Sequence, residues 1–162
     1  MPSVYLDSSA LAKRYVAEKG SDDMRAIYER SNSLRLSLSF SVWNIGEAIG
    51  VIDQYQRKGW LTKEQLLTAL ANLAGETLRL SKIEALNLVP IDQATLSDTW
   101  DLVRRHHLYQ ADALQIVSSK AAGAETFVSA DAHLLEAAKS EGLSPVDIED
   151  HGQVVANLAN LG

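Results

Sequence analysis

The sequence contains no cysteine among its 162 residues. The absence of a thiol excludes disulfide scaffolds, zinc–thiolate sites, cysteine-ligated iron–sulfur clusters and cysteine nucleophiles. No charge-free apolar run approaches the ~20 residues that a membrane-spanning helix requires. The beginning, MPSVYLDSSALA, has no basic segment and carries a carboxylate at Asp7, so we predict no signal peptide. These absences favour a globular protein, and we expect it to be cytoplasmic because a cysteine-free chain suits a reducing compartment.

Positive charge is also in short supply. The chain has 15 Lys and Arg against 21 Asp and Glu, a formal net charge of −6 with His neutral. This balance argues against salt-driven coating of nucleic acid, which needs clustered Lys and Arg. It leaves room for an enzyme that handles nucleic acid in one local groove. The length fits one domain of ~100–200 residues, and we predict a single domain over residues 1–162 because no repeat, low-complexity tract or linker interrupts the chain.

Short apolar runs alternate with segments of helical periodicity. The expected strands cover 3–6, 34–38, 86–91, 126–129 and 145–148, and the expected helices cover a segment after Asp7, 21–30, 40–58, about 62–80, 93–106, 110–122 and 131–140. Ser21 is the expected N-cap of its helix, and Gly75 is expected to kink or divide the helix that begins at Thr62. This order predicts an α/β sandwich, with helices flanking a mostly parallel central sheet. Ligands of such folds bind outside the carboxyl ends of the strands.

Four carboxylates stand apart from other charges. Asp7 is the only charged residue from 1 to 12, and Glu47 is the only one from 40 to 52. Asp112 is alone from 106 to 119 and Asp131 from 126 to 135, with His counted as neutral. Asp and Glu are rarely buried without a partner, because an unpaired buried charge costs several kcal/mol. Each of the four therefore needs a partner that its neighbours in the sequence do not supply.

Two explanations compete for these acids. Asp7, Asp112 and Asp131 each precede a helical stretch, where an Asp N-cap contributes about 0.5–2 kcal/mol. Glu47 lies inside a helix, and its structural alternative is a buried ion pair with a base distant in the sequence. The second explanation is a shared site, because Asp7 and Asp131 follow strands that end at the same edge of a parallel sheet. Carboxylates gathered there would repel one another, and protonation or a hard divalent cation such as Mg²⁺ would relieve the repulsion.

Several motifs in this order resemble the PIN domain family, and most closely its VapC-type ribonuclease toxins. They are VYLDSSAL, the helix with the lone Glu47, LYQADALQIVSSKAAG and FVSADAHLLEAAKSEGL, which together span about residues 3–149. The resemblance implies a three-layer PIN-like sandwich with Asp7, Glu47, Asp112 and Asp131 as the catalytic, metal-binding acids. It places Ser9 and Ser129 as hydroxyls that support the first and last acids. Ser129 departs mildly from the pattern, since the family often has Thr there.

The same resemblance implies endonucleolytic cleavage of RNA that depends on Mg²⁺ or Mn²⁺ and leaves 5′-phosphate and 3′-hydroxyl ends. It also implies a small VapB-type antitoxin partner, whose tail fills the active-site groove, and a homodimer. Lys13 and Arg14 follow Asp7 closely and are candidates for phosphate contact, with an ordinary solvated face as the alternative. The leucine-rich helix around 62–80 is a candidate for self-contact or for the internal core. Trp43, Trp60 and Trp100 are interpreted as core or interface residues.

Two other functions stay open at the level of the sequence. A Mg²⁺-dependent phosphatase or phosphotransfer domain also places an Asp at a strand end. It would require a second acid near Asp7 and a Lys soon after the late strand, but Ser8 and Ser9 follow Asp7 and no Lys stands just beyond Ser129. A catalytically silent PIN-like binding module would tolerate loss of the acids, whereas all four are present.

Overall fold

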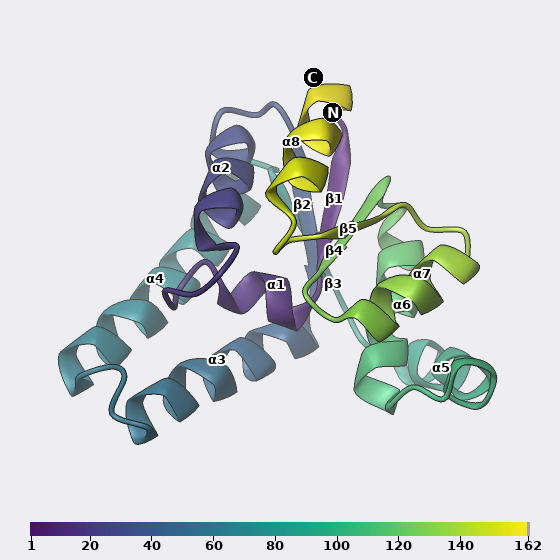
Figure 1. Ribbon diagram of the computed structural model, residues 1–162, viewed down its shortest axis with the longest axis horizontal. Coiled ribbons are helices and arrows are strands. Elements are labelled where there is room, and N and C mark those ends of the chain that lie inside the picture. Colours follow the sequence, from purple (N-terminus) through teal and green to yellow (C-terminus); the bar gives the residue numbers. More distant parts are fainter. Residues whose placement is uncertain (162) are drawn as a thin grey trace.

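A five-stranded, all-parallel sheet forms the centre of the computed structural model, which describes residues 1–161 (Figure 1). The strands are β1 (Ser3–Leu6), β2 (Ser37–Ser41), β3 (Leu86–Val89), β4 (Thr126–Ser129) and β5 (Pro145–Asp147). They lie in the order β3-β2-β1-β4-β5. The first strand is thus the middle one, paired with β2 on one side and β4 on the other.

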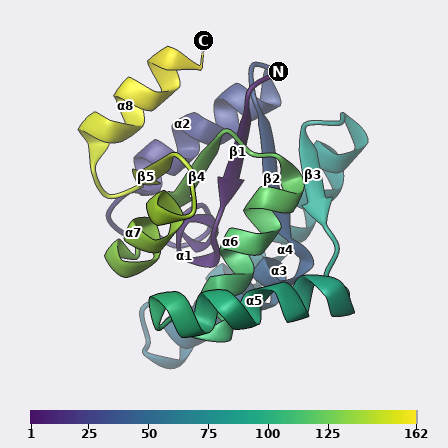
Figure 2. The same ribbon diagram turned by 90° about the vertical axis from the view of Figure 1, so that its right-hand side faces the viewer.

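Helices cover both faces of the sheet (Figures 1 and 2). Their bounds are α1 (Ser8–Ala12), α2 (Ser21–Asn32), α3 (Val42–Arg57), α4 (Lys63–Lys82), α5 (Gln93–His106), α6 (Gln110–Ala122), α7 (Ala132–Ser140) and α8 (His151–Asn160). One apolar core joins the sheet to α1–α4 and α8, and a second joins it to α5–α7. The predicted α/β sandwich with a central parallel sheet is therefore confirmed, and within the described residues every strand pairing is parallel.

The central strand explains why the sequence begins with an apolar run. Val4, Tyr5 and Leu6 are all almost fully buried, because β1 is covered by helices on both faces and by strands on both edges. Strands in that position are apolar without alternation. The strand expected at residues 86–91 is β3, which lies at one edge of the sheet and ends at Val89, just before Pro90.

Some predicted boundaries were wrong. The strand expected at 34–38 is β2 and begins three residues later, because Leu34 adopts a left-handed turn with φ 58°. The helix expected from Phe40 begins at Val42, since Phe40 belongs to the strand. Gly75 neither kinks nor divides α4, which runs unbroken over 20 residues. Gly20, and not Ser21, is the N-cap of α2.

The last helix was not predicted from the sequence. It begins after Asp150, whose side chain accepts a hydrogen bond from the N–H of Gln153, and it buries Val154 and Leu158 against the sheet. Within residues 1–161, no helix is both long enough and apolar enough to cross a bilayer.

The topology marks one crevice at the carboxyl ends of the strands. From β1 the chain moves outward to β2 and β3, then returns to the other side of β1 with β4 and β5. The direction of winding thus reverses between β1 and β4, and sheets of this kind bind ligands at such a reversal. Asp7 directly follows β1, and Asp131 lies two residues beyond β4.

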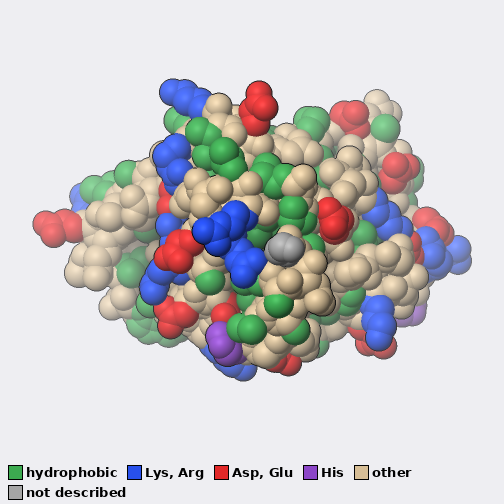
Figure 3. Space-filling model, turned by 90° about the horizontal axis from the view of Figure 1, so that it is seen from above, with side chains coloured by type: hydrophobic (Ala, Val, Ile, Leu, Met, Phe, Trp, Pro, Cys, Tyr) green, Lys and Arg blue, Asp and Glu red, His purple; other side chains and the backbone are tan. Residues whose placement is uncertain are grey.

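The face that holds both chain termini, where β1 begins, carries Lys, Arg, Asp and Glu interspersed, with no broad area of one sign (Figure 3).

Gly20 is required where the α1–α2 connection passes the segment after β5. Its φ is +87°, and an added Cβ would lie 2.7 Å from the carbonyl oxygen of Ile148. We expect Gly20→Ala to lower the free energy of unfolding by about 3 kcal/mol, from the left-handed backbone and the clash together. Gly75→Ala is the matched control, because nothing lies within 4 Å of its added Cβ, and it should stabilise α4 by up to about 1 kcal/mol. Urea denaturation measures both, and equal effects would contradict the assignment.

Candidate functional site

Asp7 is the most deeply buried of the four acids, with 3% of its surface exposed. It is the N-cap of the short helix α1, and its Oδ1 accepts a hydrogen bond of 2.8 Å from the N–H of Ala10. Ser9 Oγ lies 2.8 and 2.9 Å from its two carboxylate oxygens, and Ser129 Oγ donates to Oδ2 at 2.7 Å. Burial nevertheless outweighs these hydrogen bonds and raises the pKa of Asp7 to about 6, and the negative charge of Asp131 adds to the rise.

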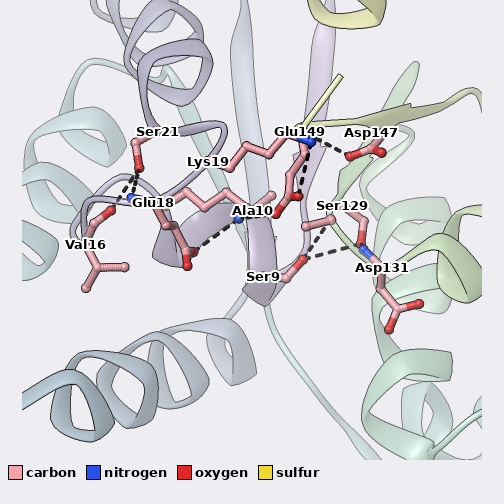
Figure 4. A network of polar contacts seen from close by, with 12 residues as sticks. Ser9, Ala10, Val16, Glu18, Lys19, Ser21, Ser129, Asp131, Asp147 and Glu149 are labelled. Atoms are coloured by element: carbon pink, nitrogen blue, oxygen red, sulfur yellow. Dashed lines mark hydrogen bonds and ion pairs between the residues drawn. The ribbon is translucent and has the colours of Figure 1, made fainter. Parts of the chain in front are cut away.

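Two backbone N–H groups fix the direction of the serine protons. The N–H of Ala130 donates to Ser9 Oγ at 2.9 Å, and the N–H of Asp131 donates to Ser129 Oγ at 3.0 Å. Each hydroxyl therefore accepts from the loop after β4 and donates to Asp7. Figure 4 shows Ser9 from α1 beside Ser129 at the end of β4 and Asp131 from the β4–α7 connection. The two serines thus link α1 to the end of β4 through the carboxylate of Asp7.

Glu47 lies in the second turn of α3 and is half-buried. Its Oε2 accepts hydrogen bonds from Ser8 Oγ and from Gln115 Nε2, the latter at 3.3 Å. The helix begins with a capping box. The side chain of Ser41, at the end of β2, accepts from the backbone N–H of Asn44, and the side chain of Asn44 accepts from the backbone N–H of Ser41. The ion pair considered as an alternative for Glu47 does not form within residues 1–161.

Asp112 lies in the first turn of α6 and is half-buried. Tyr109 is the N-cap of that helix, so the capping explanation for Asp112 is wrong. Burial raises the pKa of Asp112, and the negative charges of Asp131 and then Glu47 raise it further. Asp131 itself is exposed and caps α7, accepting from the N–H of Leu134 at 2.9 Å. Capping is therefore correct for Asp7 and Asp131 but accounts for neither Asp112 nor Glu47.

The four acids repel one another, and His133 is the basic group that opposes this repulsion at Asp112. Asp131 acts on both Asp7 and Asp112, and Asp112 also feels Glu47, so a chain of like-charge repulsion links all four. Among residues 1–161, none of the four enters a salt bridge. In the same described part, no three His, Asp or Glu side chains are arranged to hold a metal ion as they stand. The structure thus brings the acids to one edge as an open, unneutralised group.

The structure does not support the expectation that Lys13 and Arg14 contact phosphate. Lys13 is 4% exposed, and its Nζ binds Glu149 at 2.8 Å and Glu18 at 3.2 Å. Figure 4 shows these two glutamates beside the Ser9 end of the crevice, on the α1–α2 connection and after β5. Arg14 is likewise committed, because its guanidinium bonds Glu76 of α4 at 3.0 Å. Both cations neutralise acids of the framework and leave the four site acids uncompensated.

We expect Arg14→Met to act on stability and not on RNA affinity. Glu76 is only 17% exposed, and the guanidinium also lies 4.8 Å from the centre of the Tyr28 ring, so the change should cost about 2 kcal/mol in urea denaturation. Binding of an RNA oligonucleotide should stay within about twofold of the parent. Arg104→Met, on an exposed helix face, is the control and should change stability by less than about 0.5 kcal/mol. Lost RNA affinity at unchanged stability would restore Arg14 as a phosphate contact.

Sequence reasoning missed the uncharged members of the site. Ser8, Asn44 and Gln115 contact Glu47 or one another, yet only charged residues were taken as anomalies in the apolar runs. Gln115 is 2% exposed and Asn44 is fully buried, so both lie where an uncompensated amide is costly. A lone amide inside an apolar helical run, three residues from a lone acid, was the available signal.

Residues 4–140 match the PIN domain family. This chain belongs to the PIN domain family. The match contains β1 through α7 and all four acids of the site. No curated protein matches the chain.

Solved structures share the PIN fold at low sequence identity. The chain resembles VapC20 of Mycobacterium tuberculosis, titled a sarcin-ricin loop cleaving toxin, with TM-score 0.62, 14% identity and coverage of 88% of this chain and 98% of that one. PAE2754 from Pyrobaculum aerophilum gives a TM-score of 0.59 at 19% identity, covering 98% and 90% of the two chains. FitAcB from Neisseria gonorrhoeae gives 0.55 at 16% identity, covering 91% and 99%.

The tryptophans of this PIN chain are not core residues. Trp43, Trp60 and Trp100 are 47%, 60% and 65% exposed, so the core half of their interpretation is wrong. Trp43 lies on the first turn of α3, where it lines a hollow together with Glu47.

The leucine-rich helix α4 has some leucines in the core and others on the surface. Leu73 and Leu80 are buried in the core, whereas Leu67 and Leu78 are exposed.

Proposed function

We propose that this PIN chain is an endoribonuclease that depends on a divalent cation and hydrolyses phosphodiester bonds of RNA. The observation that carries the proposal is the group of four carboxylates at the reversal point of the sheet, none of which enters a salt bridge within residues 1–161. Such a group is unfavourable for the apo protein, since both Asp7 and Asp112 have raised pKa values. A bound cation would offset that cost. Membership of the PIN domain family supports nuclease activity as the function.

The donor set fits Mg²⁺ or Mn²⁺. All four side chains offer carboxylate oxygens, which hard divalent cations prefer, and the chain has no cysteine to favour a softer metal. Asp7, Glu47, Asp112 and Asp131 would hold the cation, directly or through water, with the side chains of the half-buried and exposed members adjusting to it. A divalent cation bound there supplies an activated water and relieves charge on the scissile phosphate and leaving oxygen.

The chain's own residues contribute orientation. Ser9 and Ser129 direct their protons to Asp7, so their hydroxyls serve as supports and not as nucleophiles. Ser8 and Gln115 hold the carboxylate of Glu47 by hydrogen bonds to its Oε2. Because Lys13 and Arg14, which follow Asp7 closely in the sequence, are paired elsewhere, phosphate would meet mainly negative side chains unless metal is present. Activity should therefore be wholly dependent on the cation.

We also infer that the chain works in the cytoplasm as the toxin of a VapBC-type pair, with a small antitoxin and a second copy of itself as partners. VapC20 is a sarcin-ricin loop cleaving toxin, and its fold covers most of this chain, which supports RNA as the substrate. An apolar groove of about 510 Å³ lies between α3 and α4, lined by residues such as Ile49 and Leu78. These exposed apolar walls support a protein partner there. Light scattering of the purified chain measures self-association, and co-expression with a candidate antitoxin measures the second contact.

The proposal is tested by incubating the purified protein with a mixed RNA pool in Mg²⁺, Mn²⁺ or EDTA. We expect cleavage with either metal, none in EDTA, and products with 5′-phosphate and 3′-hydroxyl ends. An Asp112→Asn preparation, purified in parallel, separates the activity from a contaminating nuclease, which would cut equally in both samples. Absence of cutting under every metal, with the protein folded, would contradict the proposal. A phosphate ester or a purely partner-binding role would then need testing.

A further inference from the structure

Gln115 is a buried amide with every polar atom in contact. It lies on α6, 2% exposed, and reaches across the end of the sheet toward β1, α1 and α3. Its Oε1 accepts from Tyr5 Oη at 3.0 Å and from Asn44 Nδ2 at 2.9 Å. Its Nε2 donates to Glu47 Oε2 at 3.3 Å and to Ser8 Oγ at 3.4 Å. One face of the amide thus meets donors from the core, and the other meets the proposed metal site.

The orientation of this amide is imposed by the backbone. The N–H of Ser41 can only donate, and it faces Asn44 Oδ1 at 3.3 Å. The carbonyl oxygen of Leu6 can only accept, and it faces Asn44 Nδ2 at 2.9 Å. Asn44 therefore has one allowed orientation, in which its Nδ2 also points at Gln115. Gln115 must answer with its oxygen, which leaves its NH₂ group toward Glu47.

The same chain of constraints fixes Ser8. Its Oγ accepts from Gln115 Nε2 and so directs its own proton to Glu47 Oε2. The result is that one carboxylate oxygen of Glu47 is held by two donors, while Oε1 is left without a hydrogen bond in the described residues. Two backbone groups thus fix the donor and acceptor directions of Asn44 and Gln115, and these fix the orientation of the Glu47 carboxylate.

We propose that Gln115 is a positioning residue that fixes the Glu47 carboxylate with Oε1 free to face the cation. The orientation of Glu47 follows from the hydrogen-bond geometry alone. Its effect on cation binding and RNA cleavage rests on the proposed function. It assigns a role to an uncharged residue of α6, three positions after Asp112. Because groups that orient metal ligands typically change metal affinity by 10–100-fold, the effect is measurable in binding as well as in catalysis.

Gln115→Met tests the proposal, with Tyr5→Phe as its matched control. Methionine has nearly the same shape but no hydrogen-bonding amide, so Mn²⁺ should bind about tenfold more weakly in calorimetric titration. In RNA cleavage we expect a similar fall in kcat with KM for RNA within about twofold. Tyr5→Phe removes a hydrogen bond on the core side of the same amide and leaves Glu47 untouched. Mn²⁺ affinity should then stay within about twofold of the parent, although some stability is lost.

A second variant keeps the test decisive if Gln115→Met fails to fold. Ser8→Ala removes the other donor to Glu47 from the short helix α1, where Ser8 is only half-buried, and should weaken Mn²⁺ binding several-fold. The positioning role would be overturned if folded Gln115→Met bound Mn²⁺ as tightly as the parent, or if Gln115→Met and Tyr5→Phe lost affinity equally. If only Ser8→Ala folds, unchanged Mn²⁺ affinity in that variant would overturn it. Mn²⁺ binding without RNA cleavage by the parent would overturn the proposed function and leave Gln115's role intact. A parent that binds no Mn²⁺ would overturn both.

Discussion

Asp112→Asn is expected to lower metal-dependent RNA cleavage by at least about 100-fold and, in EDTA, to raise the thermal midpoint of the protein. The loss of activity follows because Asp112 is one of four proposed ligands. The gain in stability follows because burial and the charges of Asp131 and Glu47 raise the pKa of Asp112, so its ionised form is unfavourable in the apo fold. Asparagine keeps the shape and removes the charge.

Calorimetric melting with EDTA and with Mn²⁺ separates the two effects. Mn²⁺ should raise the midpoint of the parent more than that of Asp112→Asn, since a ligand stabilises the form that binds it. Asp98→Asn is the matched control, because Asp98 is an exposed acid of α5 and its loss also removes one charge. A variant clearly less stable than the parent in EDTA would contradict repulsion at this edge and indicate a structural role for Asp112.

Asp7→Asn is expected to become more stable relative to the parent as pH rises, by about 2.4 kcal/mol between about pH 4 and pH 7 in EDTA. The ordinary pKa of this Asp is 3.8, and burial raises it to about 6 in the fold. Below its ordinary value the carboxyl is protonated in both states and costs nothing. Between the two values the folded protein must take up a proton or bury a charge, so the parent loses stability as pH rises. Asparagine does not titrate and escapes that loss.

Urea denaturation of both proteins across this pH range measures the difference directly, and other titrating groups cancel in the comparison. Saturating Mn²⁺ should reverse the sign near neutral pH, because the cation stabilises only the ionised carboxylate of the parent. A difference that stays flat with pH would mean that the hydrogen bonds from Ser9, Ser129 and Ala10 already compensate for burial.

The charged part of the site was predictable because it obeys two local rules. Asp7 and Asp131 follow apolar strands, and Glu47 and Asp112 interrupt apolar helical runs, so each is anomalous within a dozen residues. What could not be predicted depends on partners distant in the chain. Lys13 resembles a phosphate contact until Glu149, 136 residues away, is seen beside it. Gln115 shows its importance only once Asn44 and Glu47 face it across the crevice.

The fold shows the same division between local and distant causes. Helical periodicity predicted the helices at 93–106 and 110–122 closely, because that signal lies within each segment itself. Alternating leucines misplaced the start of β2, because Leu34 belongs to the left-handed turn that ends α2, where the N–H of Arg35 donates to the carbonyl oxygen of Arg30. The final helix, α8, is a short amphipathic segment whose burial depends on a core assembled from the rest of the chain.

The reversal of the sheet between β1 and β4 also determines when the candidate site is completed during synthesis. Asp7 leaves the ribosome among the first residues, but its support from Ser129 and its neighbour Asp131 arrive more than 120 residues later. A nascent chain that has not yet added β4 beside β1 has neither the closed crevice nor the last acid. If the proposed function holds, this arrangement keeps the chain inert for most of its translation, beside the very RNA that encodes it.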